Sequence, residues 1–191
     1  MDLERRGVEP TSRDAAAKAV AFANGLRKSI AASGRRWTQW PGGARDLGIV
    51  IACIDGVAQR LQQLPDGEDA DALVAAGVAE LRAILEWSTY QSAAIATARA
   101  LLFARKTRAF ADRLGLMGPA STQSILDSDS EASLMQNVQT KNDYMIAIAQ
   151  RHPQLGLPAP LVRPENLAPK PEKKPGKLDL IQQLTKKTKK K

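Results

Sequence analysis

The amino-acid sequence predicts an all-α fold: an irregular helical bundle of four or five helices with one long central helical segment, followed by an extended, Pro-rich, basic C-terminal tail. The 191 residues include 31 alanines and only 4% aromatic residues. A core of small aliphatic side chains suits closely approaching helices better than a β-sandwich. Apolar residues also recur at spacings of three and four, the pattern of a helix with one buried face. We find no alternating stretch that predicts a strand.

The first helix is expected after an N-terminal arm, residues 1–13, whose mixed charges show no periodicity and which we expect to be flexible. Asp14 is a suitable N-cap, because its carboxylate can accept hydrogen bonds from the free backbone N–H groups of the first turn. The helix is expected to end at about Ser33, where Gly34 is a stop signal. Its apolar face is expected to contain Val20, Phe22, Leu26 and Ile30.

The second helix is expected from about residue 44 to residue 64. It follows a connection, residues 34–43, that is marked by glycines and a proline. A turn at residues 65–67, with the sequence Pro-Asp-Gly, is expected to end it. The helix has the cleanest amphipathic pattern in the chain, formed by Leu47, Val50, Ile51, Ile54 and Leu61.

The longest proline-free segment, residues 69–115, is rich in Ala, Leu, Arg and Glu, which all favour a helix. A single helix of this length would extend roughly 65–70 Å, which exceeds the diameter of a compact domain of this size. We therefore expect a break or bend near residues 87–89 rather than a projecting helix. The apolar residues of the segment include Leu73, Leu81, Ile84, Leu85, Ile95, Leu102, Phe103 and Phe110.

A last helix is expected from about Ser128 to Gln150. Ser128 and Glu131 have the spacing of a capping box, and Pro153 is expected to end the helix. The helical domain is thus predicted to span residues 14–152.

The C-terminal part of the chain is expected to be extended. Seven of the eleven prolines lie in residues 153–176, which predicts a linker with polyproline-like stiffness. Residues 177–191 combine a short amphipathic segment with a Lys-rich tail.

Positive charge is concentrated at this end. The chain has a formal net charge of +8. From Ala159 onwards there are ten Lys and Arg against three Asp and Glu, a net of +7, so residues 1–158 carry only +1. Residues 61–86 hold six acidic and one basic residue, whereas residues 87–126 hold five basic and one acidic. This zoning favours head-to-tail contacts between copies, and a basic arm on a nearly neutral body is common among proteins that bind polyanions.

The basic tail predicts a non-specific, salt-sensitive interaction with nucleic acid. Lysines contact phosphates with little dependence on base sequence, because each neutralised phosphate releases counterions. The alternatives are a solubilising tail without a partner, a targeting signal and an anionic membrane. The candidate contacts are Lys173, Lys174, Lys177, Lys186, Lys187, Lys189, Lys190 and Lys191, with a second patch formed by Arg105, Lys106, Arg108 and Arg113. Alternatively, the second patch is a solvated surface that pairs with the acidic residues 61–86.

A short apolar stripe precedes the terminal lysines. Leu178, Ile181 and Leu184 would share one face of a helix, which suggests a tethered peptide, residues 177–185, that fits a groove on a partner. The alternative is a weakly structured tail, because so short a helix is marginal in water.

The connection before the second helix holds Arg35, Arg36, Trp37 and Trp40. Basic residues beside exposed indoles can stack on bases or contact a membrane interface. The alternative is that the two tryptophans fix the loop over the helical core while the arginines stay solvated.

No pattern in the sequence points to catalysis, a metal or a cofactor, and we expect a non-enzymatic protein. Cys53 is the single cysteine and lies in an apolar run, which predicts a buried structural thiol, and His152 is the single histidine. The sequence contains no GxSxG, P-loop, GxGxxG or HExxH motif. Without a signal peptide or an apolar span, we expect an intracellular protein and no stable membrane insertion.

The leading hypothesis is a structural protein that self-associates and binds nucleic acid electrostatically through its basic tail. Helical, Ala-rich bodies with basic ends occur among viral and phage virion proteins, and the composition resembles theirs. A nucleocapsid-like or virion-internal protein, a homo-oligomer in a larger protein assembly, is therefore expected. One alternative is a protein–protein interaction adaptor or assembly factor that uses residues 177–185. The other is a peripheral membrane or matrix protein.

Overall fold

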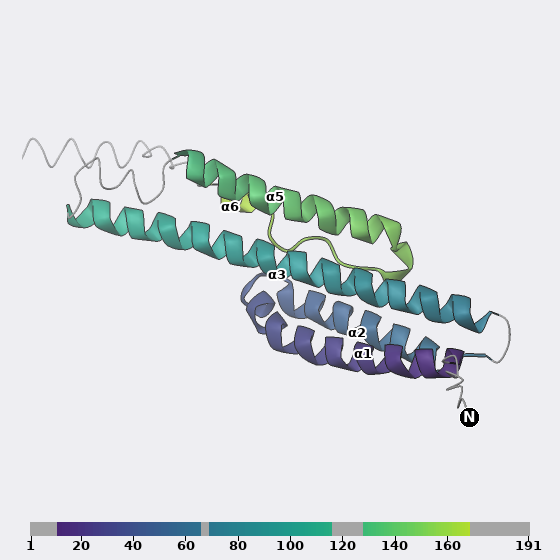
Figure 1. Ribbon diagram of the computed structural model, residues 1–191. Helices are drawn as coiled ribbons and strands as arrows, with labels where there is room; N and C mark the ends of the chain where they lie inside the picture. The colour runs from purple at the N-terminus through teal and green to yellow at the C-terminus, as the bar shows by residue number, and fades with distance from the viewer. Residues whose placement is uncertain (1–10, 66–68, 116–127, 169–191) are drawn as a thin grey trace, which may run out of the picture.

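A computed structural model describes residues 11–65, 69–115 and 128–168 of the chain (Figure 1). In these ranges the chain forms helices and no strand, so the all-α prediction is confirmed. The elements are α1 (Ser12–Ser33), the 3-10 helix η1 (Gly34–Gln39), α2 (Gly43–Gln62), α3 (Ala70–Leu114), α5 (Ser128–Arg151), the 3-10 turn η2 (Pro153–Leu155) and α6 (Pro164–Leu167). Figure 1 shows α3 in the middle, with α1 and α2 on one side of its N-terminal half and α5 antiparallel to it on the other side.

The N-cap of α1 is Thr11, so the prediction that Asp14 would be the N-cap is wrong by three residues. The Thr11 hydroxyl accepts a hydrogen bond from the Asp14 backbone N–H at 3.3 Å, and the Asp14 carboxylate accepts one from the Thr11 backbone N–H at 3.3 Å. The two residues form a capping box in which aspartate takes the place of the usual glutamate. Residues 1–10 of the expected arm lie outside the described residues.

The buried face of α1 is a row of small side chains. Phe22 is 43% exposed, so the expectation that it lies on this face is wrong. Its neighbour Ala23 is fully buried, and successive residues of a helix are about 100° apart. Small side chains let α1 lie close to α2 and α3. The buried residues of α1 are Ala16, Ala19, Ala23, Leu26 and Ile30.

Trp37 of η1 fixes the turn between α1 and α2 to the middle of α3. Its side chain is fully buried, and its Nε1 donates a hydrogen bond to the Ser92 hydroxyl at 3.1 Å. Its ring meets that of Trp87 edge to face, with 5.8 Å between centroids, a geometry that adds to the gain from apolar burial. The end of the α1–α2 hairpin therefore lies against α3 at Ser92.

Two glycines allow the sharp turn into α2. Gly42 has a φ of +83°, in the left-handed region that favours glycine. Gly43 is buried, and a Cβ there would overlap the carbonyl oxygen of Trp37. The backbone of η1 and the start of α2 can approach this closely only because residue 43 has no side chain.

We expect Gly43→Ala to lower the free energy of unfolding by about 1–3 kcal/mol, because η1 must move away from the added methyl group. Thermal unfolding followed by circular dichroism measures the change. Gly25→Ala is the matched control, since nothing lies within 4 Å of a Cβ at this mid-helix glycine. It should raise the stability by about 0.5–1 kcal/mol. Equal stabilities of the two variants would contradict the close contact at Gly43.

α3 is one continuous helix of 45 residues, so the expected break near residues 87–89 is wrong. Trp87 and Ser88 are buried in the centre of the bundle, where packing on both sides holds the helix together. The excess length does not stay inside a compact domain but extends past the end of the α1–α2 hairpin (Figure 1). Leu114 is 22 residues beyond Ser92, about 33 Å of helix.

α5 packs along the other side of α3 with Val138, Met145 and Ile148, all fully buried or nearly so. Tyr90 of α3 and Tyr144 of α5 stack with 5.1 Å between ring centroids. The predicted capping box at the start of α5 stays a prediction, because the Ser128 side chain is outside the described residues.

Residues 153–168, which we call the strap, consist of the turn η2, residues 156–163 without regular secondary structure, and the short helix α6. They pack on the helices, so this part of the chain is not the extended linker that its prolines predict. Leu155, Val162 and Leu167 are buried against the helices. Polar contacts tie Gln154 to Glu80 and the Leu167 carbonyl to Arg105, and these positions on α3 are 25 residues, or about 38 Å, apart. The strap thus follows α3 from the level of Glu80 to that of Arg105.

Candidate functional site

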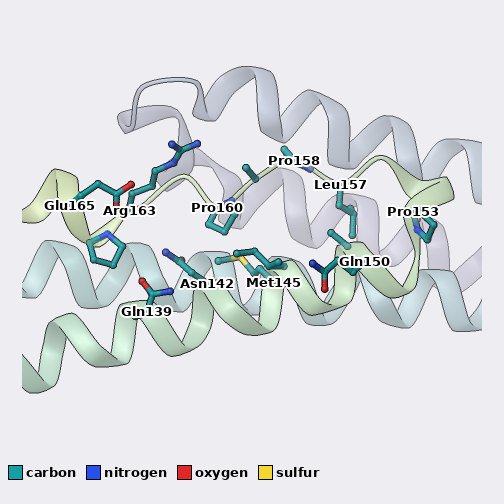
Figure 2. Close-up of a pocket in the computed structure, with 14 residues that line it drawn as sticks. Gln139, Asn142, Met145, Gln150, Pro153, Leu157, Pro158, Pro160, Arg163 and Glu165 are labelled. Atoms are coloured by element: carbon teal, nitrogen blue, oxygen red, sulfur yellow. The ribbon is translucent and has the colours of Figure 1, made fainter.

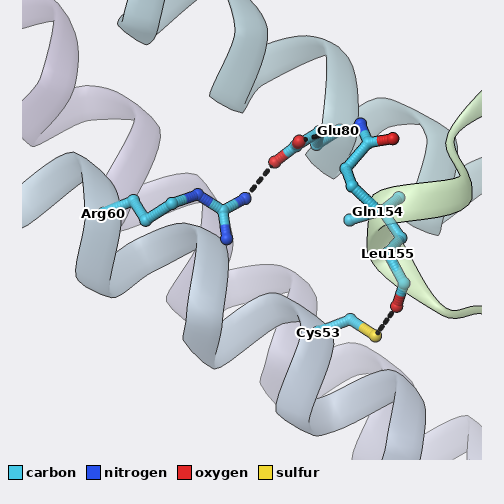
Figure 3. A network of polar contacts seen from close by, with 5 residues as sticks. All are labelled: Cys53, Arg60, Glu80, Gln154 and Leu155. Carbon is cyan, nitrogen blue, oxygen red and sulfur yellow. Dashed lines mark hydrogen bonds and ion pairs between the residues drawn. The ribbon is translucent and has the colours of Figure 1, made fainter.

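The start of the strap is held by a polar network at the junction of α2 and α3 (Figure 3). The Cys53 thiol donates to the Leu155 carbonyl oxygen at 2.8 Å, and Gln154 Nε2 donates to the Glu80 carboxylate at 3.0 Å. The same carboxylate pairs with Arg60. Cys53 is partly buried rather than buried as predicted. The burial it has raises the pKa of the thiol, so the thiol keeps its proton near neutral pH and serves as a donor rather than a nucleophile.

Arg105 holds the other end of the strap. Its guanidinium pairs with the Glu131 carboxylate of α5 and also donates to the Leu167 carbonyl oxygen. The two charged side chains are only 22% and 27% exposed. Arg105 was predicted to belong to a phosphate-contacting patch, but its charge is directed into the protein and already paired.

A groove of about 670 Å³ lies between α5 and the strap (Figure 2). Its walls are mostly apolar, from Met145 and Ile146 of α5 and from the strap prolines 158 and 160. The Asn142 amide donates to the Val162 carbonyl oxygen at 2.7 Å and ties the strap to the floor of the groove. Arg163 and Glu165 lie at one end, and Figure 2 shows the Arg163 guanidinium directed away from α5.

The groove offers shape and apolar surface but little chemistry. Its polar groups are amides and one exposed Arg and Glu, with no nucleophile placed beside a base among the residues that line it. In the part of the chain that the structure describes, no group of His, Cys, Asp and Glu is arranged to hold a metal ion. None of the helices within the same ranges is both long and apolar enough to cross a bilayer.

The predicted loop constellation divides into buried and exposed members. Trp37 is fully buried and has no free ring face for a base, which agrees with the alternative that it fixes the loop to the core. Trp40 is partly buried and packs against the same core. Arg35 and Arg36 are exposed on η1.

The projecting end of α3, residues 96–114, carries the rest of the second patch. Lys106, Arg108 and Arg113 are all exposed there. Phe103 and Phe110 are 72% and 59% exposed, although both belong to the apolar series of the segment. One signal in the sequence could have distinguished these two rings from the core residues. They are seven residues apart and alternate with the basic residues at 99, 106 and 113, which have the same spacing.

The C-terminal contacts lie outside the described residues, and their assignment stays a prediction. This applies to the lysines at 173, 174, 177, 186, 187, 189, 190 and 191 and to the apolar stripe of Leu178, Ile181 and Leu184.

Comparison of the chain with protein-family models, curated proteins and solved structures finds no match.

Proposed function

We propose that this chain is a non-enzymatic structural protein that self-associates and binds nucleic acid by charge, as a nucleocapsid-like or virion-internal protein does. The observation that carries the proposal is the separation of charge. Residues 1–158 have a net charge of +1, and the segment from Ala159 onwards has +7. A polyanion is the partner that best matches such an arrangement, because its phosphates attract lysines without any need for a fixed geometry.

The described body adds exposed cations at the projecting end of α3. Lys106 and Arg113 share one side of the helix, and Arg108 lies on the opposite side. Arg105 is left out of this patch because of its contacts with Glu131 and Leu167. The two basic elements together would hold nucleic acid along the protein rather than at one recognition site.

The test replaces the eight tail lysines at positions 173, 174, 177, 186, 187, 189, 190 and 191 by glutamine in the full-length chain. We expect the affinity for a labelled oligonucleotide to fall at least about 100-fold at low salt, and the salt dependence of binding to flatten. Fluorescence anisotropy at several salt concentrations measures both. Circular dichroism should be unchanged, because none of the eight lysines lies in the described helices.

A variant with the order of residues 173–191 scrambled is the matched control. It keeps every lysine, so its binding should equal that of the natural tail if charge alone acts. Light scattering with and without nuclease measures the copy number and any co-purified nucleic acid. Unchanged affinity after neutralisation of the tail, or a monomer in all conditions, would contradict the proposal.

A further inference from the structure

The projecting end of α3 continues the side of the helix that α1 and α2 cover in its other half. Ser92, which accepts the hydrogen bond from Trp37, is followed at intervals of seven by Arg99, Lys106 and Arg113. Positions seven apart in a helix differ by only about 20° around the axis. The three cations therefore lie on the side of α3 that the α1–α2 hairpin leaves uncovered beyond η1 (Figure 1).

Two aromatic rings lie between these cations. Phe103 and Phe110 are 72% and 59% exposed and are also seven residues apart. The order along the helix is Arg, Phe, Lys, Phe, Arg at positions 99, 103, 106, 110 and 113, with about 4.5–6 Å of rise between neighbours. We call these five residues the α3 stripe. Neither Arg99 nor Lys106 has an ionic partner among the described residues.

The 3-10 helix η1 lies near the first residue of the stripe. It contacts α3 at Ser92, about 10 Å along the axis from Arg99. η1 carries Arg35 and Arg36, both exposed. Exposed cations therefore occur on η1, within two residues of the contact that Trp37 makes with Ser92, as well as on the stripe.

We propose that the α3 stripe binds single-stranded nucleic acid, with bases stacked on Phe103 and Phe110 and phosphates beside Arg99, Lys106 and Arg113. This inference rests on the proposed nucleic-acid function and names the class of strand and its site on the body. Exposed aromatic rings in a basic groove bind single strands, because unpaired bases offer their faces to the rings. The bases of a duplex are already stacked on each other and present only their edges.

Charge and shape disfavour other occupants. A second copy packed stripe against stripe would bring two identical rows of cations together, which is repulsive. The tail of the same chain carries a net charge of +7 from Ala159 onwards and is repelled for the same reason. A copy packed head to tail would instead place its acidic residues 61–86 on the stripe, and the measurement of oligomers in the Phe variant tests for it. A bilayer needs a broad apolar face, whereas the two rings of the α3 stripe alternate with three cations.

The experiment compares Phe103→Ala/Phe110→Ala with the natural full-length chain for binding to a fluorescent oligothymidine and to a duplex of equal length. We expect the affinity for the single strand to fall at least about tenfold, and that for the duplex to change less than about threefold. Lys106→Gln should reduce the slope of log affinity against log salt by about 0.7 for the single strand. Phe22→Ala removes a ring that is 43% exposed on α1 and should have no effect.

Several results would overturn the inference. Equal losses for single strand and duplex would exclude stacking, and unchanged oligothymidine affinity would exclude the site. Loss of binding to polyglutamate in the Phe variant would indicate an acidic protein partner instead. If the natural chain floats with anionic vesicles and the Phe variant does not, the ligand of the stripe is a lipid. If the natural chain forms oligomers that the Phe variant does not form, the ligand is a second copy.

The same measurements separate this inference from the proposed function. If neutralising the tail abolishes binding but the Phe variant binds normally, only the α3 stripe is wrong. If the natural chain binds neither the oligothymidine nor the duplex, both proposals fail. The Phe variant should fold normally, because the two rings are largely exposed, and its melting curve checks this.

Discussion

Replacing Trp37 by alanine is expected to lower the free energy of unfolding by about 3–5 kcal/mol. The indole is fully buried, packs edge to face on Trp87 and donates a hydrogen bond to Ser92. Its loss leaves a cavity at the point where η1, α2 and α3 meet. Domains of this kind have only about 5–15 kcal/mol in total, so a large fraction of the variant should unfold below the melting temperature of the natural chain. Urea unfolding followed by circular dichroism measures the difference.

Trp40→Ala is the matched control for this variant. Trp40 follows the same turn but is only partly buried, so its loss should cost less than half as much. Equal losses would show that Trp37 is not the anchor of the turn. Because Trp40→Ala should remain folded, it also tests whether the loop contacts nucleic acid, a question that Trp37→Ala cannot answer.

The helices were largely predictable because each has a local signal. The amphipathic pattern of the second helix placed Val50, Ile54 and Leu61 on its apolar face, and all three are buried. Glycine and proline signals located the ends of the helices to within a few residues. Local patterns of this kind depend on the period of the helix and not on its neighbours.

The long helix α3 shows what local sequence signals cannot predict. Its continuity depends on packing against α1, α2 and α5, and a helix packed in this way does not have to fit inside a compact body. Periodicity also shows that one side of a helix is apolar without showing which stretch of that side is covered. Phe103 and Phe110 follow the same period as buried Leu81, yet they lie beyond the end of the α1–α2 hairpin.

The candidate site was predictable only in part for a related reason. The spacing separates Arg105 from Lys106 and Arg113 but does not show what Arg105 contacts, and the structure shows that it faces α5 and the strap and pairs with Glu131. A pairing across 26 residues cannot be seen in the local pattern. The prolines of the strap likewise do not show whether the segment is a free linker or is packed on the protein.

The largest loss of stability is expected when the chain is truncated after His152. The strap buries Leu155, Val162 and Leu167, each of which gains about 1.5–3 kcal/mol on burial. Their removal therefore costs about 5–9 kcal/mol, which is similar to the whole stability of a small domain. It also uncovers the apolar groove side of α5 along Met145. We expect no cooperative unfolding transition for this truncated chain.

A chain truncated after Ala168 is the matched comparison, because it keeps the strap and loses only residues 169–191. Its unfolding transition should coincide with that of the full chain, while its affinity for nucleic acid should fall, since that segment carries the lysine-rich part of the tail. The pair of truncations separates two roles that proline-rich sequence alone cannot separate: a segment that completes the core and a segment that attracts phosphates. A chain ending at His152 that unfolds cooperatively at the same urea concentration as the full chain would mean that the strap contributes nothing to the core, and the boundary between body and tail would then lie at Pro153.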